Sequence, residues 1–233
     1  MKSLVVPAAI LLAALAVATR ADDAIALIPH DRIDHAALGI FPASMGGVEI
    51  QAGLSAPVFL VPEMADTTAG RWQAPSNTSP LTLRESGGAV TGSATFKWGG
   101  GAPVEFQMSA KPSGRHVDVA GAWKVDGDAA GHFRFDIRIP TTLAADISVR
   151  AGEKEIFARG EVRPGLGSGP LVFSRTSDGA ELFRVEGNFF AGGFVEKERF
   201  DRFGLSVRLS PHKMSGATKL GEFSKFELKF IFP

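Results

Sequence analysis

Apolar and polar side chains alternate along much of this chain, and this alternation constrains its fold more than any other feature. The clearest run is at 133–139, where four apolar residues alternate with three charged residues before Pro140. A period of two residues places successive side chains on opposite faces of a β-strand. We therefore predict a strand whose phenylalanines and isoleucines are buried and whose charged face is in water. Other alternating runs lie at 91–98, 104–108 and 226–232.

Further candidate strands fill most of the rest of the chain, separated by glycine, proline and Asp-Gly turns. They lie at 116–119, 122–125, 146–150, 155–162, 170–175, 181–186 and 205–209. No segment after the first 21 residues carries a sustained apolar stripe at the helical spacing of about 3.6 residues. Roughly a dozen strands at intervals of about 8–15 residues predict an all-β fold, an antiparallel β-sandwich, with a closed lipocalin-like β-barrel as the alternative. Residues 62–80, rich in proline, serine and threonine, are interpreted as a loop.

The N-terminal segment has the pattern of a secretory signal peptide. Lys2 is followed by an apolar run from Leu4 to Ala18, and small residues then offer cleavage after Ala18 or Ala21. This run of about 15 residues is shorter than the roughly 20 that a membrane-spanning helix needs. We therefore expect residues 1–21 to be a signal peptide and residues 22–233 to form a single β-sandwich domain. The protein is expected to be exported to the periplasm, the cell surface or the extracellular space, without spanning a membrane once the signal is removed.

Charge and composition exclude several classes of protein. The whole chain carries 25 basic and 25 acidic residues, and cleavage after residue 21 would remove only Lys2 and Arg20, leaving 23 basic residues against 25 acidic ones. This balance gives no basic face of the kind that nucleic-acid binding needs. The chain has no cysteine, which rules out thiol catalysis and cysteine-ligated zinc or iron–sulfur centres. No cofactor is predicted.

The sequence contains no recognisable catalytic or metal-binding motif. His30 and His35, with Asp31 and Asp34 between them, lack a third ligand and the spacing of a zinc-binding helix, so we interpret them as a solvated segment. No histidine has a neighbour that marks it as a general base, and the glycines at 165–169 are interpreted as a turn. Two carboxylates could still pair to cleave a glycosidic bond. The candidates are Glu105, Asp118, Asp136, Asp146, Glu181 and Glu186.

The three tryptophans are the predicted ligand-binding residues. Trp72 lies in the proline-rich segment, Trp98 precedes three glycines, and Trp123 lies between Ala122 and Lys124. An exposed indole can stack on the apolar face of a sugar ring, and burying about 100 Å² of such a surface is worth about 2–3 kcal/mol before costs. The alternative interpretation is that these indoles belong to the hydrophobic core, most of all Trp98 and Trp123, which follow the strand alternation.

Two parts of the chain resemble known families. Between about residues 90 and 232, the strand rhythm and turn placement resemble non-catalytic β-sandwich modules that accompany bacterial glycoside hydrolases. The stretches that carry this resemblance are 123–127, 133–140, 202–209 and 223–232. It implies a carbohydrate-associated domain that acts alone or with a separate protein partner.

The second resemblance is local. Residues 200–204 and 91–96 are similar to short stretches of the periplasmic lipocalin-like family that binds polyisoprenoids. This similarity implies an apolar ligand held inside a barrel lined by phenylalanine.

Together these observations favour a non-catalytic, carbohydrate-associated binding or assembly module. Its expected ligand is a polysaccharide or an oligosaccharide, held by the tryptophans. The first alternative is a periplasmic lipocalin-like carrier of an apolar ligand. The second is a carbohydrate-active enzyme that uses a pair of the carboxylates named above.

Overall fold

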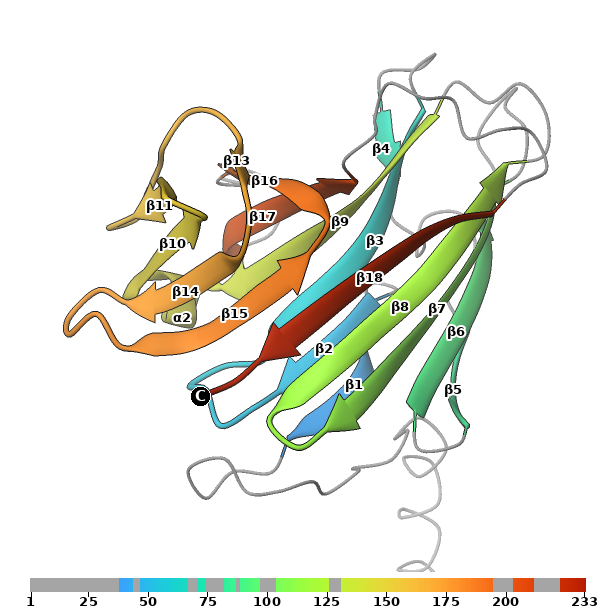
Figure 1. Cartoon of the computed structure of the whole chain (residues 1–233), viewed down its shortest axis with the longest axis horizontal. Helices are drawn as coiled ribbons and strands as arrows, with labels where there is room; N and C mark the ends of the chain where they lie inside the picture. The colour runs from blue at the N-terminus through green and yellow to red at the C-terminus, as the bar shows by residue number, and fades with distance from the viewer. Residues whose placement is uncertain are drawn as a thin grey trace, which may run out of the picture.

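The structure is a computed structural model that describes residues 38–43, 47–66, 71–73, 82–86, 89–96, 104–125, 131–194, 203–211 and 223–233. These residues form two antiparallel β-sheets packed face to face and one short helix (Figure 1). The predicted all-β fold is confirmed, and the architecture is that of a β-sandwich. Within the described residues each sheet runs from one edge strand to another without closing, so the alternative of a closed barrel is not seen.

The first sheet contains eight strands. Its order is β1-β2-β3-β9-β17-β16-β13, and β4 pairs with β3. Their bounds are β1 (Gly39–Ala43), β2 (Gly47–Gln51), β3 (Val58–Asp66), β4 (Arg71–Gln73), β9 (Gly131–Pro140), β13 (Gly167–Ser168), β16 (Phe189–Phe194) and β17 (Phe203–Pro211).

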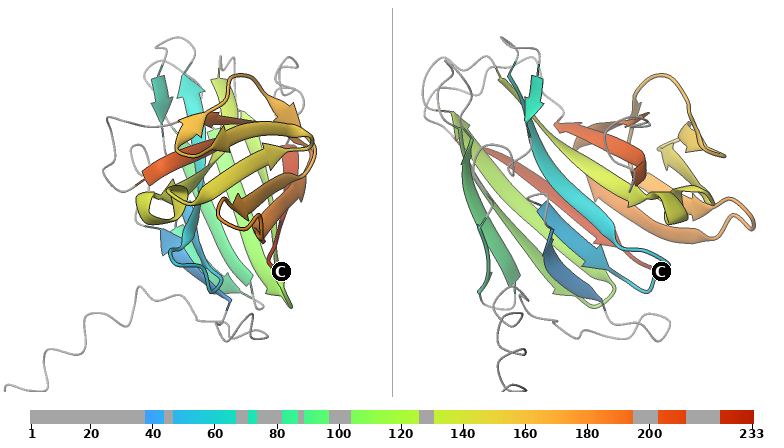
Figure 2. Two further views of the ribbon diagram at one scale, coloured as in Figure 1. Left: turned by 90° about the vertical axis from the view of Figure 1, so that its left-hand side faces the viewer. Right: turned by 180° about the vertical axis from the view of Figure 1, so that it is seen from behind.

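The second sheet contains ten strands in the order β12-β11-β10-β14-β15-β18-β8-β7-β6-β5. Their bounds are β5 (Thr82–Ser86), β6 (Ala89–Phe96), β7 (Val104–Ser113), β8 (His116–Val125), β10 (Ile147–Ala151), β11 (Lys154–Ala158), β12 (Glu161–Val162), β14 (Leu171–Arg175), β15 (Glu181–Gly187) and β18 (Phe223–Ile231). Helix α2 (Thr141–Ala144) connects β9 to β10. In Figure 2 the blue and cyan strands β1 to β3 and the green strands β5 to β8 belong to opposite layers.

The hydrophobic core lies between the inner faces of the two sheets. Four aromatic side chains join the sheets near its centre. The Phe135 ring of β9 lies 4.4 Å from the Phe226 ring of β18 and 6.2 Å from the Phe106 ring of β7, measured between centroids. Trp123 of β8 packs on Phe226 at 6.2 Å. Phenylalanine brings large apolar area without a hydroxyl to satisfy, which suits this position.

The segment predicted as a loop at 62–80 is partly strand, which corrects that prediction. Strand β3 continues to Asp66, and β4 pairs with its end. Proline lacks a backbone N–H and is tolerated where no ladder bond needs one. Pro62 pairs with Phe135 on one side of β3, and on the other side the pairing with β2 ends at Leu60 and that with β4 starts at Met64. The gap between the two partners accommodates the proline.

Several predictions concern residues outside the described part of the chain. The signal peptide at 1–21 and the histidine-containing segment at 30–35 are among them, and both stay predictions. Within the described residues, no helix is long and apolar enough to cross a membrane.

Candidate functional site

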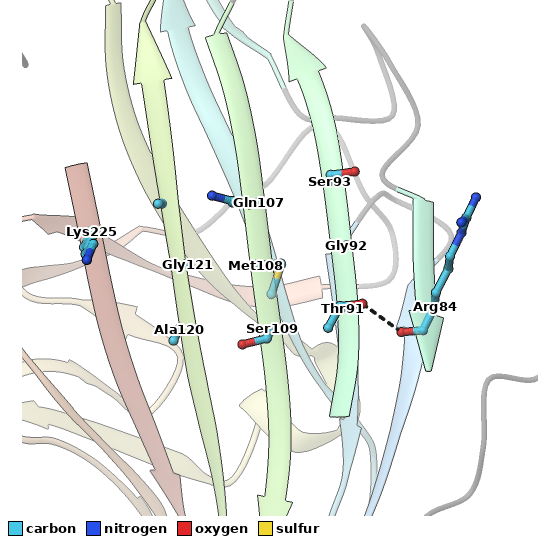
Figure 3. Close-up of a pocket in the computed structure, with 11 residues that line it drawn as sticks. Arg84, Thr91, Gly92, Ser93, Gln107, Met108, Ser109, Ala120, Gly121 and Lys225 are labelled. Atoms are coloured by element: carbon cyan, nitrogen blue, oxygen red, sulfur yellow. Dashed lines mark hydrogen bonds between the residues drawn. The ribbon is translucent and has the colours of Figure 1, made fainter. Parts of the chain in front are cut away.

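A hollow of about 660 Å³ lies on the outer face of five neighbouring strands of the second sheet, β5, β6, β7, β8 and β18 (Figure 3). We call it the outer-face groove. The residues that line it are Arg84, Thr91, Gly92, Ser93, Gln107, Met108, Ser109, Ala120, Gly121, Ala122 and Lys225.

Strand register places the outward-pointing residues of the groove in two adjacent rows that cross the strands. One row consists of Ser93, Gln107, Ala122 and Lys225, and the other of Arg84, Thr91, Ser109 and Ala120. Side chains two residues apart on a strand share a face. The residues between the rows, such as Met108, therefore point the other way, and Met108 is buried in the core.

The groove is hollow because short side chains lie between longer ones. On one side, the next row carries Glu105 opposite Lys124. On the other side, the next row carries Lys111, Asp118 and Lys229. Serine, threonine and alanine in the two central rows leave a trough between these charged walls.

The floor of the groove depends on a glycine. At Gly121, a Cβ atom would fall 2.5 Å from the backbone oxygen of Gln107 and would also meet the Phe226 ring. Without that atom, β18 packs its phenylalanine against the inner side of β8, directly behind the groove. The aromatic core therefore supports the floor.

Most of the uncharged polar side chains in the groove make no hydrogen bond to another described residue. The Thr91 hydroxyl donates a hydrogen bond to the Arg84 backbone oxygen at 3.3 Å. Within the described part of the chain, the side chains of Ser93, Gln107 and Ser109 have no hydrogen-bond partner. Hydroxyls and an amide both donate and accept hydrogen bonds, so these groups can serve a polar ligand in either sense.

Trp123, one of the three predicted ligand-binding residues, lies behind the groove and not in it. Its side chain is on the inner face of β8, is 9% exposed and belongs to the hydrophobic core. This position favours the core interpretation of that tryptophan over stacking on a sugar.

The other two predicted tryptophans stay untested. The backbone of Trp72 is in β4, in the sheet opposite the groove, and its side chain lies outside the described part of the structure. Trp98 lies outside the described residues altogether.

The residues that line the groove were not among the predicted site residues. The sequence does contain a signal for them. The outward-facing positions of β6, β7 and β8 in the groove carry small or uncharged residues, whereas the corresponding positions of β9 carry charged ones. These positions are Thr91, Ser93, Gln107, Ser109, Ala120 and Ala122. Recognising that they form one surface requires the pairing of the strands.

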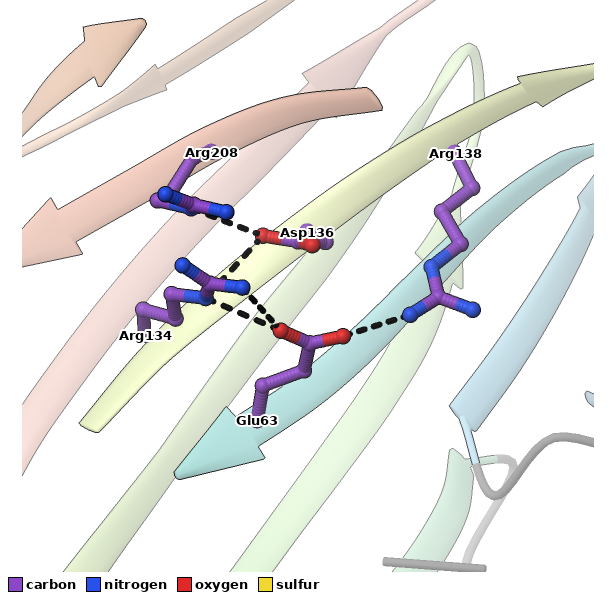
Figure 4. Close-up of polar contacts among 5 residues, drawn as sticks. All are labelled: Glu63, Arg134, Asp136, Arg138 and Arg208. Atoms are coloured by element: carbon purple, nitrogen blue, oxygen red, sulfur yellow. Dashed lines mark hydrogen bonds and ion pairs between the residues drawn. The ribbon is translucent and has the colours of Figure 1, made fainter. Parts of the chain in front are cut away.

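A second polar cluster lies on the outer side of the first sheet (Figure 4). Four of its five residues are buried, and Arg208 is partly exposed. Glu63 of β3 accepts hydrogen bonds from the Arg134 Nε at 2.9 Å and from the Arg138 guanidinium. Asp136 lies between Arg134 and Arg208, with its Oδ1 3.5 Å and 3.7 Å from their Nε atoms. Arg208 comes from β17, so three adjacent strands build the cluster.

The prediction that the charged face of β9 is solvated is therefore wrong. Arg134, Asp136 and Arg138 are 2%, 0% and 3% exposed, although they alternate with core residues as predicted. Burial of these charges is tolerated because the neighbouring strands β3 and β17 supply oppositely charged partners, Glu63 and Arg208. Buried charges are found where such partners satisfy them.

Burial dominates the electrostatics of this cluster. It raises the pKa of Asp136 to about 7, and the negative charge of Glu63 adds to the rise, while the nearby arginines oppose it. Within the described residues, neither oxygen of Asp136 accepts a hydrogen bond. Burial also lowers the pKa of Arg134.

Glu63 and Asp136 are two carboxylates in one cluster, but their surroundings do not suit the chemistry of a glycoside-cleaving enzyme. Both are buried, and Glu63 is held by two arginines. The outer-face groove is in the other sheet, and none of the residues that line it is acidic. We interpret the cluster as a structural ion-pair network.

Metal and histidine chemistry find little support in the described residues. They contain no group of three or more side chains arranged to hold a metal ion. His116, which the sequence left without an evident partner, places its Nε2 atom 3.2 Å from the Asp118 Oδ2. This pair is partly exposed on a single strand, a position typical of a surface ion pair.

Comparison with known proteins gives no family for this chain: no family model matches it, and no curated protein matches it.

Proposed function

We propose that this protein is a non-catalytic carbohydrate-binding module and that its outer-face groove binds a polysaccharide or oligosaccharide chain. Two adjacent rows of uncharged, mostly short side chains across the three central strands β6, β7 and β8 of the groove support this function best. They combine a trough with hydrogen-bonding groups and an apolar floor. The same function is the one that the sequence favours, although through different residues.

The groove suits an extended polar chain. Neighbouring strands lie about 4.8 Å apart, so the four gaps from β5 to β18 span about 19 Å. A run of several sugar rings can lie across the strands over that length. The length and the open side of the groove are typical of sites that bind an internal stretch of a polysaccharide. Such a site does not need to accommodate the ends of the ligand.

The chemistry of the lining matches a sugar. The hydroxyls of Ser93 and Ser109 and the amide of Gln107 can pair with sugar hydroxyls. The methyl groups of Ala120 and Ala122 offer an apolar surface to the C–H groups of the sugar, which lie between its hydroxyls. Each hydrogen bond contributes about 0.5–1.5 kcal/mol net, so we expect modest affinity at each site.

Binding without catalysis fits the groove better than the two alternatives. None of the residues that line it is acidic, so no carboxylate pair faces a bound chain there. For a carrier, the space between the sheets would have to hold the ligand. In the described residues that space contains the packed phenylalanine core.

The proposal can be tested by blocking the groove. Ala120 is an exposed residue of its floor, so Ala120→Phe should fill the trough without disturbing the core. We expect gels that contain polysaccharide, neutral or acidic, to retard the unaltered protein for at least one polysaccharide. The Ala120→Phe variant should lose this retardation.

A matched control places the same ring elsewhere on the second sheet. Arg150→Phe adds a phenylalanine at an exposed position of β10, far along the sheet from the groove. It should keep the retardation. Failure of every polysaccharide to retard the unaltered protein would count against the function, and so would full retardation of Ala120→Phe.

A further inference from the structure

We infer that the outer-face groove prefers acidic polysaccharides, whose carboxylate or sulfate groups would be bound by Arg84 and Lys225, an inference that rests on the carbohydrate-binding function proposed above. The two cations lie on opposite sides of the groove (Figure 3). Arg84 comes from β5 and Lys225 from β18, so a chain that crosses the strands would meet one at each end.

Some exposed basic residues of the protein are already paired: Arg163 and Arg175 each lie within 4 Å of an acidic side chain. Others, such as Arg150, are exposed and make no ion pair with any described residue. Arg84 and Lys225 are distinguished from these by lining the groove from opposite sides. Neither Arg84 nor Lys225 makes an ion pair with any residue that the structure describes. Both are exposed at the groove, so their charges are available to a ligand.

The walls do not cancel this positive charge. The two flanking rows carry Lys111, Lys124 and Lys229 against Glu105 and Asp118. Glu227 lies beside Ala120 at the β18 end and adds one carboxylate. Together with Arg84 and Lys225, the described side chains of this surface therefore include five cations and three carboxylates. Among the residues that line the groove itself, Arg84 and Lys225 are the only charged ones.

Charge complementarity follows from this arrangement. Hydrogen bonds between charged partners are shorter and stronger than those between neutral groups. A guanidinium can meet a carboxylate or sulfate with two parallel hydrogen bonds, and an ammonium acts as a point charge. A neutral chain could use only the hydroxyls and the amide between the two cations.

The test compares one neutral polymer with two acidic ones. The purified protein is run in native gels that contain dextran, dextran sulfate or alginate, and the affinity is taken from the retardation at each polymer concentration. Dextran sulfate presents sulfates, alginate presents carboxylates, and dextran presents neither. Raising the salt concentration should weaken binding to the acidic polymers, because exposed charges are screened.

Two double variants with the same change in net charge separate the groove from the rest of the surface. Arg84→Gln/Lys225→Gln should lower the affinity for dextran sulfate or alginate about tenfold, which corresponds to about 1.4 kcal/mol. Arg150→Gln/Arg163→Gln, at exposed positions near the opposite end of the sheet, should change it by less than about twofold, because exposed charges far from the bound chain are largely screened.

The outcomes are distinct. Retardation by dextran sulfate or alginate that the groove variant loses supports the inference and identifies the acidic group. Equal losses in both double variants would show a general charge effect and overturn it. Binding of dextran by the unaltered protein as tightly as the acidic polymers, or an unchanged affinity of the groove variant for the acidic polymers, would also overturn it, yet leave the carbohydrate-binding function in place. If none of the three polymers, nor any other polysaccharide, retards the protein, that function fails as well.

Discussion

Asp136 has a completely buried carboxylate between two arginines, and its surroundings favour the protonated form. Burial raises its pKa to about 7, and the nearby Glu63 carboxylate adds to this rise. Such a residue couples the stability of the fold to pH in the direction opposite to that of a carboxylate whose pKa is lowered. The effect acts at the scale of one residue, and one substitution should isolate it.

We predict that Asp136 makes the free energy of unfolding fall as the pH rises from about 4 to about 7. In this range the folded state holds a proton that the unfolded chain, with an ordinary pKa of 3.8, has lost. The stabilisation from this proton is present in full at pH values below the pKa of the unfolded state. It is lost at pH values above the pKa of the folded state. Its slope approaches about 1.4 kcal/mol per pH unit for one proton. Asp136→Asn should remove that slope, which urea unfolding at several pH values would measure.

The comparison needs a control, because other carboxylates contribute slopes of their own. Glu105→Gln removes an exposed carboxylate outside the buried cluster and should leave the difference between pH 4 and pH 7 nearly unchanged. An Asp136→Asn variant with the same pH dependence as the unaltered protein would show that Asp136 is ionised throughout this range.

At the scale of elements, the contact between β8 and β18 positions the groove. Nine residue pairs join the two strands, and Phe226 of β18 lies against Gly121 of β8. The same ring stacks on Phe106 and contacts Phe135 of the opposite sheet. A Cβ atom at Gly121 would clash with both this ring and the Gln107 backbone oxygen.

We predict that Gly121→Ala lowers the free energy of unfolding by about 1–3 kcal/mol, the usual cost of overpacking a core. The adjacent Ala120→Ser, on the exposed face of the same strand, should stay within about 0.5 kcal/mol. Urea unfolding followed by tryptophan fluorescence measures both. Equal stability of the two variants would mean that β18 can move away from β8 at little cost.

At the scale of the whole molecule, the two sheets share one hydrophobic core. A single cluster of buried residues includes side chains from both sheets. The chain also passes between the sheets repeatedly, for example from β8 to β9, from β9 through α2 to β10, and from β15 to β16. Neither sheet can separate without exposing the phenylalanine core of the other.

We therefore predict one cooperative thermal transition for the protein. Far-ultraviolet circular dichroism, which reports the strands, and tryptophan fluorescence, which reports the surroundings of the three tryptophans, including Trp123 in the core, should give the same midpoint. Two separate midpoints would contradict this and would indicate two independently folding units, against the single domain expected for residues 22–233.

Much of the fold could be predicted from the sequence because each strand carries its own signal. The alternation at 133–139 determines where β9 lies and which of its side chains face the core. Turn residues such as Asp178-Gly179 mark where the chain reverses. These are local properties, since backbone geometry alone places alternate residues on opposite faces.

The environment of the second face of each strand was decided only by the tertiary structure. The polar face of β9 is buried, and β3 and β17 bring Glu63 and Arg208 beside it as oppositely charged partners. The polar faces of β6, β7 and β8 instead form an open groove, because their pairing aligns short side chains in adjacent rows. Alternation distinguishes two faces, but what covers each face depends on strand partners that are far apart in the sequence.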